Sequence, residues 1–314
     1  QTVAEGGSAV INVIGILEKA LPVFLMLGLG MLCRKTGLLS REGVNTLKSV
    51  AVNITLPAVM FSAFATAEYN AASISIPLVM FAACLLALFL GFAGCRLLGI
   101  KGRLSPFMAA GFEAGMLGYA LFAILFSEAE RPAFAIVDLG QVLFVFTVYK
   151  ALLAGKGGLR GVVQEAVTSP TVWAIAAGLL VGATGLYKAL IPSGVSGIIN
   201  AVTDFVSAPT SAIILLAIGY DLVFADVRWA QTLKLVGLRL GVSGILLGLL
   251  VLANRLLGGM MHTGALLMML ILPPPYVLPI FADVEEERAD ISSALSLLTL
   301  IGILLYVVLV IFFA

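Results

Sequence analysis

The chain has 314 residues, of which 61% are hydrophobic and only 11% are charged. Polar side chains could not cover so much apolar surface in a domain of this length, so the composition excludes a water-soluble fold. The formal net charge is +1, which leaves no excess of basic side chains, and we expect no nucleic-acid partner.

Long apolar runs follow one another along the chain, separated by short polar breaks. A bilayer core about 30 Å thick needs about 20 apolar residues for each helical crossing. Strands of a membrane barrel would alternate over about ten residues, whereas these runs are continuously apolar. The sequence therefore predicts an all-α integral membrane protein, a single domain over residues 1–314. The ten predicted transmembrane helices are Ala9–Leu32, Val44–Ala65, Ile76–Leu98, Leu104–Phe126, Ala133–Leu153, Thr171–Ile191, Val195–Leu222, Leu233–Leu256, His262–Phe281 and Ala289–Phe313.

Basic side chains concentrate on one side of this predicted membrane domain. The loops after helices 1, 3, 5, 7 and 9 share a side, and by the positive-inside rule that side is cytoplasmic. We therefore expect a multi-pass protein of the bacterial inner membrane with both termini in the periplasm. The basic residues on the predicted cytoplasmic side are Arg34, Lys35, Arg41, Lys48, Arg96, Lys101, Arg103, Lys150, Lys156, Arg160, Arg228, Lys234, Arg239 and Arg288.

The two halves of the chain resemble each other weakly and in the same order. Ser40–Ala65 and Pro192–Gly219 each begin with a small polar turn and continue into a helix with a proline at the same depth, Pro57 or Pro209. Each half holds five predicted helices, an odd number, so the second half must cross the membrane upside down relative to the first. We predict an inverted 5+5 repeat. The two repeats span about 9–153 and 171–313.

Helix-weakening residues interrupt the fourth and the ninth predicted helix. Gly115 and Gly118 lie within the fourth, and Pro273–Pro275 lie within the ninth. An acidic stretch follows each, Ser127–Arg131 in one half and Asp283–Asp290 in the other. Backbone groups freed at such breaks cannot face lipid, so they must be buried or line a cavity. Paired discontinuous helices therefore predict a binding site near the bilayer midplane.

Five short segments carry a family resemblance through their order and spacing. They are Gly37–Gly43 (GLLSREG), Asn53–Phe61 (NITLPAVMF), Gly115–Leu121 (GMLGYAL), Pro209–Leu222 (PTSAIILLAIGYDL) and Ser292–Leu300 (SSALSLLTL). Together they make the chain resemble a bacterial member of the auxin efflux carrier family, within the bile acid/auxin transporter superfamily. The resemblance spans nearly the whole chain.

This resemblance implies a specific architecture and mechanism. Helices 1, 2, 6 and 7 would form a scaffold that usually dimerises, and helices 3–5 and 8–10 would form a transport domain. Helices 4 and 9 would unwind and cross at the substrate site. The family carries small organic anions by an elevator-like motion, so the resemblance implies a secondary transporter and not an enzyme.

Two departures from the family pattern concern the expected site. The fourth helix of the family commonly reads like N-T-G-x-x-G-L-P-L, whereas this chain has Glu113 at the asparagine position and Ala120 at the proline position. The ninth helix often carries an asparagine after its proline, where this chain has Tyr276 and Val277. A carboxylate at the site would repel an anionic substrate unless it is protonated.

Ionisable side chains deep in a membrane helix are costly, so each one is a functional candidate. Glu113 lies beside the predicted break in helix 4, where it either titrates in the substrate or coupling site or makes a structural hydrogen bond. Asp138, with Gln141 on the same helical face, is either a coupling site or part of a solvated helix end. Asp204 lies five residues before Pro209 and either lines a cavity or snorkels.

Three polar residues near the breaks complete the candidate site. Asn53 lies four residues before Pro57, so its amide either satisfies a freed carbonyl or binds substrate. Tyr119 and Tyr276 flank the two breaks and either offer hydroxyl groups or simply pack. The predicted substrate-binding residues are Asn53, Glu113, Gly115, Gly118, Tyr119, Pro273, Pro274, Pro275 and Tyr276. The candidates for coupling to H⁺ or Na⁺ are Glu113, Asp138, Gln141 and Asp204.

Other classes of function find less support in the sequence. His262 is the only histidine, so a metal site lacks a histidine partner, and no catalytic triad or phosphate-binding loop is present. We expect no cofactor and no resident metal. The remaining alternatives are a sodium- or proton-coupled carrier of an amino acid or bile-acid-like compound, a channel, or an intramembrane enzyme. The expected partners are a small-molecule substrate, membrane lipids and a second copy of the chain.

Overall fold

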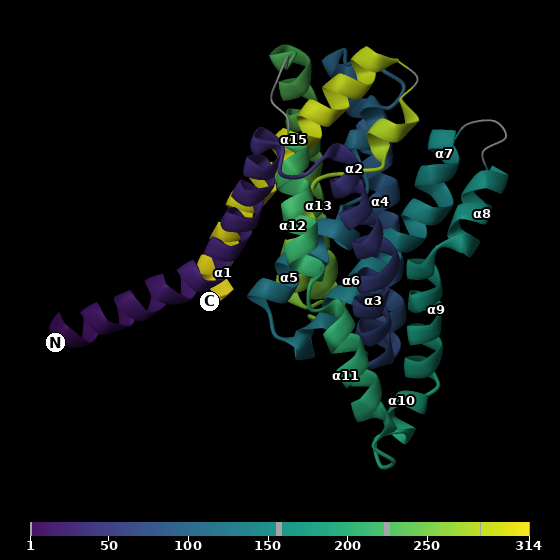
Figure 1. The fold of residues 1–314 in the computed structure, drawn as a ribbon. Helices are drawn as coiled ribbons and strands as arrows, with labels where there is room; N and C mark the ends of the chain where they lie inside the picture. Colours follow the sequence, from purple (N-terminus) through teal and green to yellow (C-terminus); the bar gives the residue numbers. More distant parts are fainter. Residues whose placement is uncertain (1, 155–158, 223–226, 283, 314) are drawn as a thin grey trace.

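A computed structural model describes residues 2–154, 159–222, 227–282 and 284–313, and every regular element in those ranges is helical (Figure 1). Lys156 and Asp283, which the sequence places at the charged loops, lie outside the described residues. Eight described segments are long and apolar enough to cross a membrane. They are Ile14–Thr36, Arg41–Ala65, Ile74–Leu98, Ser105–Leu125, Glu128–Leu153, Val195–Asp221, Trp229–Leu256 and Glu285–Phe313.

Several of these segments consist of shorter helices in series. In the first half the elements are α1 (Thr2–Thr36), α2 (Arg41–Val50), η1 (Ala51–Thr55), α3 (Leu56–Ala65), α4 (Ala71–Leu98), η2 (Ser105–Ala109), η3 (Ala114–Gly118), α5 (Tyr119–Leu125), η4 (Glu128–Glu130), α6 (Arg131–Phe144), η5 (Val145–Tyr149) and α7 (Lys150–Ala154). In the second half they are α8 (Leu159–Thr168), α9 (Pro170–Ala183), α10 (Leu186–Ala189), α11 (Val195–Ser207), α12 (Thr210–Asp221), α13 (Trp229–Leu256), α14 (Thr263–Ile271), η6 (Leu278–Phe281) and α15 (Glu285–Phe313).

Two of the ten expected helices have no counterpart among these eight segments. The expected sixth helix, Thr171–Ile191, ends at Ala183, because Gly185 adopts a left-handed conformation with φ of 72°. The resulting 14-residue helix α9 rises only about 21 Å, which is less than the bilayer core. The expected ninth helix, His262–Phe281, stops at Ile271 and resumes as the short η6.

The helices pack in two groups. In one, α3 packs extensively against α9 and also contacts α11, while α1 packs extensively against α12. In the other, α4 packs against α6, η2 and α13, and α15 packs against α13 and α14. Small residues allow close approach in the first group, since a Cβ atom on Gly30 of α1 would lie 2.1 Å from the Leu216 carbonyl oxygen of α12.

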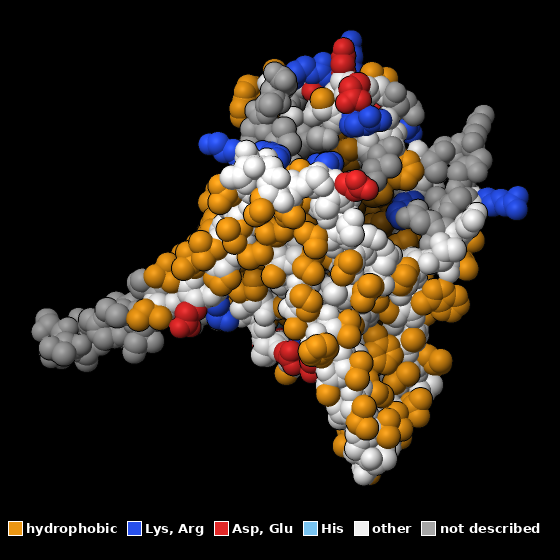
Figure 2. All heavy atoms as spheres, in the orientation of Figure 1, with side chains coloured by type: hydrophobic (Ala, Val, Ile, Leu, Met, Phe, Trp, Pro, Cys, Tyr) orange, Lys and Arg blue, Asp and Glu red, His pale blue; other side chains and the backbone are white. Residues whose placement is uncertain are grey.

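Charged side chains gather at one end of the molecule, whereas apolar side chains cover its flanks (Figure 2). At that end, Arg41 and Lys48 both pair with Asp221, which joins α2 to the end of α12. Arg228 pairs with Asp290 at 2.5 Å and so fixes the start of α13 against α15. These pairs link neighbouring helices where water can solvate the charges.

Arg239 does not belong to this charged end, contrary to the expectation from the sequence. It lies within α13 and is only 2% exposed. Its guanidinium group donates hydrogen bonds to two backbone carbonyl groups, which take the place of solvent, as described below.

Candidate functional site

The fourth predicted helix is broken, four residues earlier than its glycines suggested. The short helix η2 ends at Ala109, and the chain becomes extended at Ala110 before it resumes as η3 at Ala114. Gly111 lies in this break with φ of 70°, a conformation that glycine adopts without strain. A Cβ atom there would also approach the Pro275 ring to 3.0 Å. The break therefore depends on Gly111, which the sequence patterns did not single out.

The ninth predicted helix is broken at its prolines, as expected. Helix α14 ends at Ile271, and Leu272 is extended. Pro273, Pro274 and Pro275 follow as buried residues before η6 begins at Leu278. Proline lacks the N–H group that a continuing helix would need, so the run of three prevents the helix from closing.

The two breaks meet and are joined by hydrogen bonds, and we call this meeting point the crossing. The backbone N–H of Glu113 donates to the Pro273 carbonyl at 2.8 Å. In return, the Tyr276 N–H donates to Oε2 of Glu113 at 2.6 Å. The other carboxylate oxygen, Oε1, accepts from the Met116 N–H at 3.2 Å. The Glu113 side chain thus satisfies backbone donors on both sides of the crossing.

Gly118 makes the close packing around this crossing possible. A Cβ atom on Gly118 would lie 2.8 Å from Leu272 Cδ1 and 2.9 Å from Phe134 Cζ, and both of those side chains are buried. A Cβ atom on Gly115 would meet only Leu56, at an ordinary 3.7 Å. Of the two glycines predicted at the site, Gly118 is the one that the packing requires.

A buried arginine holds the opposite ends of both breaks. Arg239 Nη1 donates to the Ala109 carbonyl at 2.8 Å, and Nη2 donates to the Leu272 carbonyl at 2.9 Å. The guanidinium group also lies over the Phe112 ring, 4.6 Å from its centroid. Ala109 and Leu272 end the first halves of the two broken helices, where carbonyl groups lack helical partners and a cation is favoured.

Glu113 and Arg239 therefore occupy electrostatically opposite positions at the crossing. The carboxylate of Glu113 accepts from N–H groups at the start of η3 and in the second break, where an anion is favoured. Arg239 could have been noticed in the sequence, because an arginine inside a long apolar helix is itself unusual. Its partners could not, because they lie 130 and 33 residues away.

Tyr276 ties the second break to α15. Its hydroxyl lies 2.9 Å from Thr299 Oγ1, and Thr299 also donates to the Leu295 carbonyl within α15 at 2.7 Å. The contact with Thr299 thereby holds Tyr276, whose backbone N–H donates to Glu113.

Three further predicted residues come together beside the first break. Asp138 and Gln141 of α6 are buried, and Gln141 Nε2 donates to Asp138 Oδ1 at 3.2 Å. The Tyr119 hydroxyl faces Asp138, but its geometry falls short of a hydrogen bond. Tyr119 Oη, Asp138 Oδ2 and Gln141 Oε1 are all buried and have no hydrogen-bond partner among the described residues. Asp138 is therefore buried, which corrects the alternative of a solvated helix end.

A small polar cavity opens between α5 and the start of α12, and we call it the α5/α12 cavity. Its volume is about 280 Å³. The polar side chains that line it include Tyr119, Glu128, Arg131, Asp204, Thr210 and Ser211. Asp204 of α11, near the junction with α12 at Pro209, and Tyr119 of α5 therefore line the same cavity. The sequence did not predict that these helices are neighbours.

Two predicted residues lie elsewhere or serve a local role. Asn53 is exposed, and its amide donates to the Ser49 carbonyl at 2.9 Å and to Ser49 Oγ at 3.1 Å, so it does not reach the crossing. His262 caps α14 by accepting from the Ala265 N–H at 3.1 Å, and it lies 3.4 Å from Glu130.

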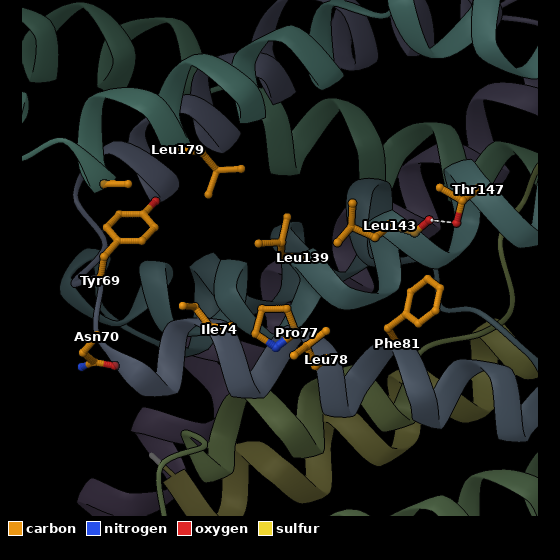
Figure 3. Close-up of a pocket in the computed structure, with 11 residues that line it drawn as sticks. Tyr69, Asn70, Ile74, Pro77, Leu78, Phe81, Leu139, Leu143, Thr147 and Leu179 are labelled. Carbon is orange, nitrogen blue, oxygen red and sulfur yellow. Dashed lines mark hydrogen bonds between the residues drawn. The ribbon is translucent and has the colours of Figure 1, made fainter.

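A second, larger cavity contains none of the predicted site residues. It measures about 830 Å³ and lies between α4, α6 and α9, with Pro77, Phe81 and Leu139 among its lining residues (Figure 3). Its polar groups are already engaged, since the Tyr69 hydroxyl donates to the Phe64 carbonyl and Thr147 Oγ1 donates to the Leu143 carbonyl. This apolar space suits lipid better than a polar solute.

Two discontinuous membrane helices that cross at buried backbone groups are characteristic of secondary transporters. Residues 15–157, which include the first break and Glu113, match the family model described as membrane transport protein. An uncharacterized transporter of Methanothermobacter thermautotrophicus is 25% identical over 243 residues, covering 74% of this chain and 77% of the relative. The resemblance to a family of membrane transport proteins, drawn from the sequence, is thereby confirmed.

Proposed function

We propose that the protein is a secondary transporter that moves a small organic solute across the bacterial inner membrane by an elevator-type alternating-access mechanism. The observation that carries the proposal is the crossing, where Glu113 bonds the N–H groups of both breaks and Arg239 bonds the carbonyl groups that precede them. Such irregular backbone is tolerated in a membrane only where it is buried in protein or lines a cavity.

The elevator mechanism is supported by the packing of the helices. The group of α1, α3, α9, α11 and α12 would be the scaffold, and the group around α4, α6, α13, α14 and α15 would carry the substrate. Both breaks belong to the second group, together with Arg239. Movement of that group as one body would preserve the bonds at the crossing while it exposes the site to either side.

Proton or sodium coupling is supported by the buried cluster beside the first break. Asp138 Oδ2, Gln141 Oε1 and Tyr119 Oη are oxygen atoms without partners among the described residues. Buried polar atoms of this kind call for an explanation, and a bound proton or cation would supply one. Glu113 is the second candidate, because it lies at the crossing itself.

The substrate class has two candidates. The family resemblance favours an organic anion, whereas the carboxylate of Glu113 at the crossing favours a solute that also carries a positive charge. Flux into proteoliposomes tests the function itself. A transporter saturates with substrate and shows counterflow, whereas a channel conducts without saturation and shows no counterflow.

A further inference from the structure

We propose that the α5/α12 cavity binds a small zwitterion, a solute that carries both a carboxylate and an ammonium group, as an α-amino acid does. This inference rests on the proposed function as a transporter and specifies its substrate class. The cavity of about 280 Å³ equals roughly nine water volumes, so it admits only a small solute.

The carboxylate of the solute would bind to Arg131. The side chain of Arg131 is only 13% exposed, and its Nη2 lies 3.1 Å from Oε1 of Glu128. Glu128 is 73% exposed, so it can rotate into solvent at little cost and leave the guanidinium group to a ligand. A guanidinium group also binds a carboxylate with two parallel hydrogen bonds.

The ammonium group of the solute would bind to Asp204. This side chain lines the same cavity and is only partly exposed. Within the described residues its carboxylate makes no hydrogen bond and no ion pair, although Ser207 Oγ donates to its backbone carbonyl at 3.2 Å. A carboxylate without a partner in a confined cavity favours a cationic ligand.

A third polar residue, Tyr119, also lines the cavity. It is 2% exposed, and its hydroxyl faces Asp138 without a hydrogen-bond partner among the described residues. The α5 wall of the cavity is therefore polar as well.

The charges in this cavity favour a zwitterion over a simple anion. Once Glu128 has rotated into solvent, Arg131 contributes one positive charge to the cavity and Asp204 one negative charge. The N–H groups at the helix crossing, the other place that would favour an anion, are already bonded to the carboxylate of Glu113. A zwitterion gives Arg131 and Asp204 one partner each, whereas an anion leaves Asp204 unpaired and close to a like charge.

The test is ligand-induced thermal stabilisation of the purified full-length protein in detergent at pH 7. The probes are the 20 proteinogenic amino acids, and for each hit the matched deaminated acid and decarboxylated amine, such as 4-methylpentanoate and 3-methylbutylamine for leucine. We expect at least one amino acid to stabilise the protein at a concentration where both of its matched analogues do not.

Charge variants identify the two partners. Asp204→Asn should weaken amino-acid binding about tenfold or more and remove the preference over the deaminated acid, while Asp204→Glu keeps the preference. Arg131→Gln should weaken amino-acid binding similarly, with Arg131→Lys as the charge-preserving control. The melting temperature of each variant without ligand shows whether it is folded.

Three results would overturn the proposal: stabilisation by none of the 20 amino acids, equal binding of the deaminated acid by the parent, or unchanged binding by folded Asp204→Asn. Failure of the proposed function looks different. Saturable counterflow of some other solute would reject the zwitterion and leave the transporter intact, whereas flux that never saturates would reject the transporter.

Discussion

The N–H of Tyr276 donates a 2.6 Å hydrogen bond to the carboxylate of Glu113, 163 residues earlier in the chain. A single side chain in the first half of the chain thus satisfies the backbone of the break in the second half. The carboxylate also accepts from the Met116 N–H in its own half of the chain. Any change in the protonation or identity of Glu113 should therefore affect both broken helices together.

Glu113→Gln is predicted to fold and to abolish the pH dependence or the ion coupling of transport. The glutamine keeps the size of the side chain and one acceptor oxygen, but it cannot release a proton. Parent and variant should be compared in proteoliposomes from pH 5 to pH 8 and with sodium replaced. Identical transport under all of these conditions would mean that Glu113 has only a structural role.

Arg239→Met is predicted to destabilise the protein by about 3 kcal/mol, because two buried carbonyl groups lose a charged donor. Among the described side chains, only Arg239 donates to the Ala109 and Leu272 carbonyl groups. Thermal unfolding in detergent measures the effect. Arg96→Met on the exposed face of α4 is the matched control, and an equal small effect of both variants would contradict the prediction.

Gly118→Ala is predicted to destabilise the crossing by about 1 kcal/mol or more, because its Cβ would meet Leu272 and Phe134 at less than 3 Å. Gly115→Ala is the control, since its Cβ would lie 3.7 Å from Leu56. The measurement is the melting temperature of each variant together with its initial rate of transport. Equal tolerance of the two substitutions would show that the packing at Gly118 can relax.

The charge distribution predicts that both termini face the periplasm. Cysteines introduced for Ser193, after the sixth predicted helix, and for Arg41, after the first, should be labelled from opposite sides of intact cells. Ser193 should react with an impermeant maleimide from outside, and Arg41 only after lysis. The native cysteines Cys33, Cys84 and Cys95 are buried, so their background should be low. Labelling of both positions from the same side would contradict the predicted topology.

A homodimer is predicted with helices 2 and 7 at its interface. Ile198, Val202 and Phe205 form an exposed apolar stripe on α11, at 66%, 57% and 84% exposure. Single cysteines along this stripe and at Ile54 of η1 should give disulfide-linked dimers under mild oxidation in membranes. Cysteines on the exposed face of α13, for example at Leu249, are the control. A monomeric mass in detergent without any crosslink would count against the dimer.

Local properties of the sequence determined the class of protein and much of its helical layout. Apolar length alone predicts membrane spans, and eight of the ten predicted helices have counterparts of sufficient length. The run from Pro273 to Pro275 also located the second break, because three successive residues without an N–H group cannot continue a helix. The position of the first break was less predictable, because Gly111 carries a left-handed turn whereas Gly115 and Gly118, in the same predicted helix, do not.

Only the tertiary structure decided which distant residues meet at the site. The partners of Glu113 and Arg239 lie in other helices, and hydropathy along the chain contains no information about which helices become neighbours. A count of basic residues assigns Arg239 to the cytoplasmic side, whereas in the tertiary structure it is buried against the ends of two helices. The sequence specifies where the polar groups are, while the close packing of helices decides which of them must satisfy one another, because a buried polar group needs a partner and water cannot supply it in the membrane.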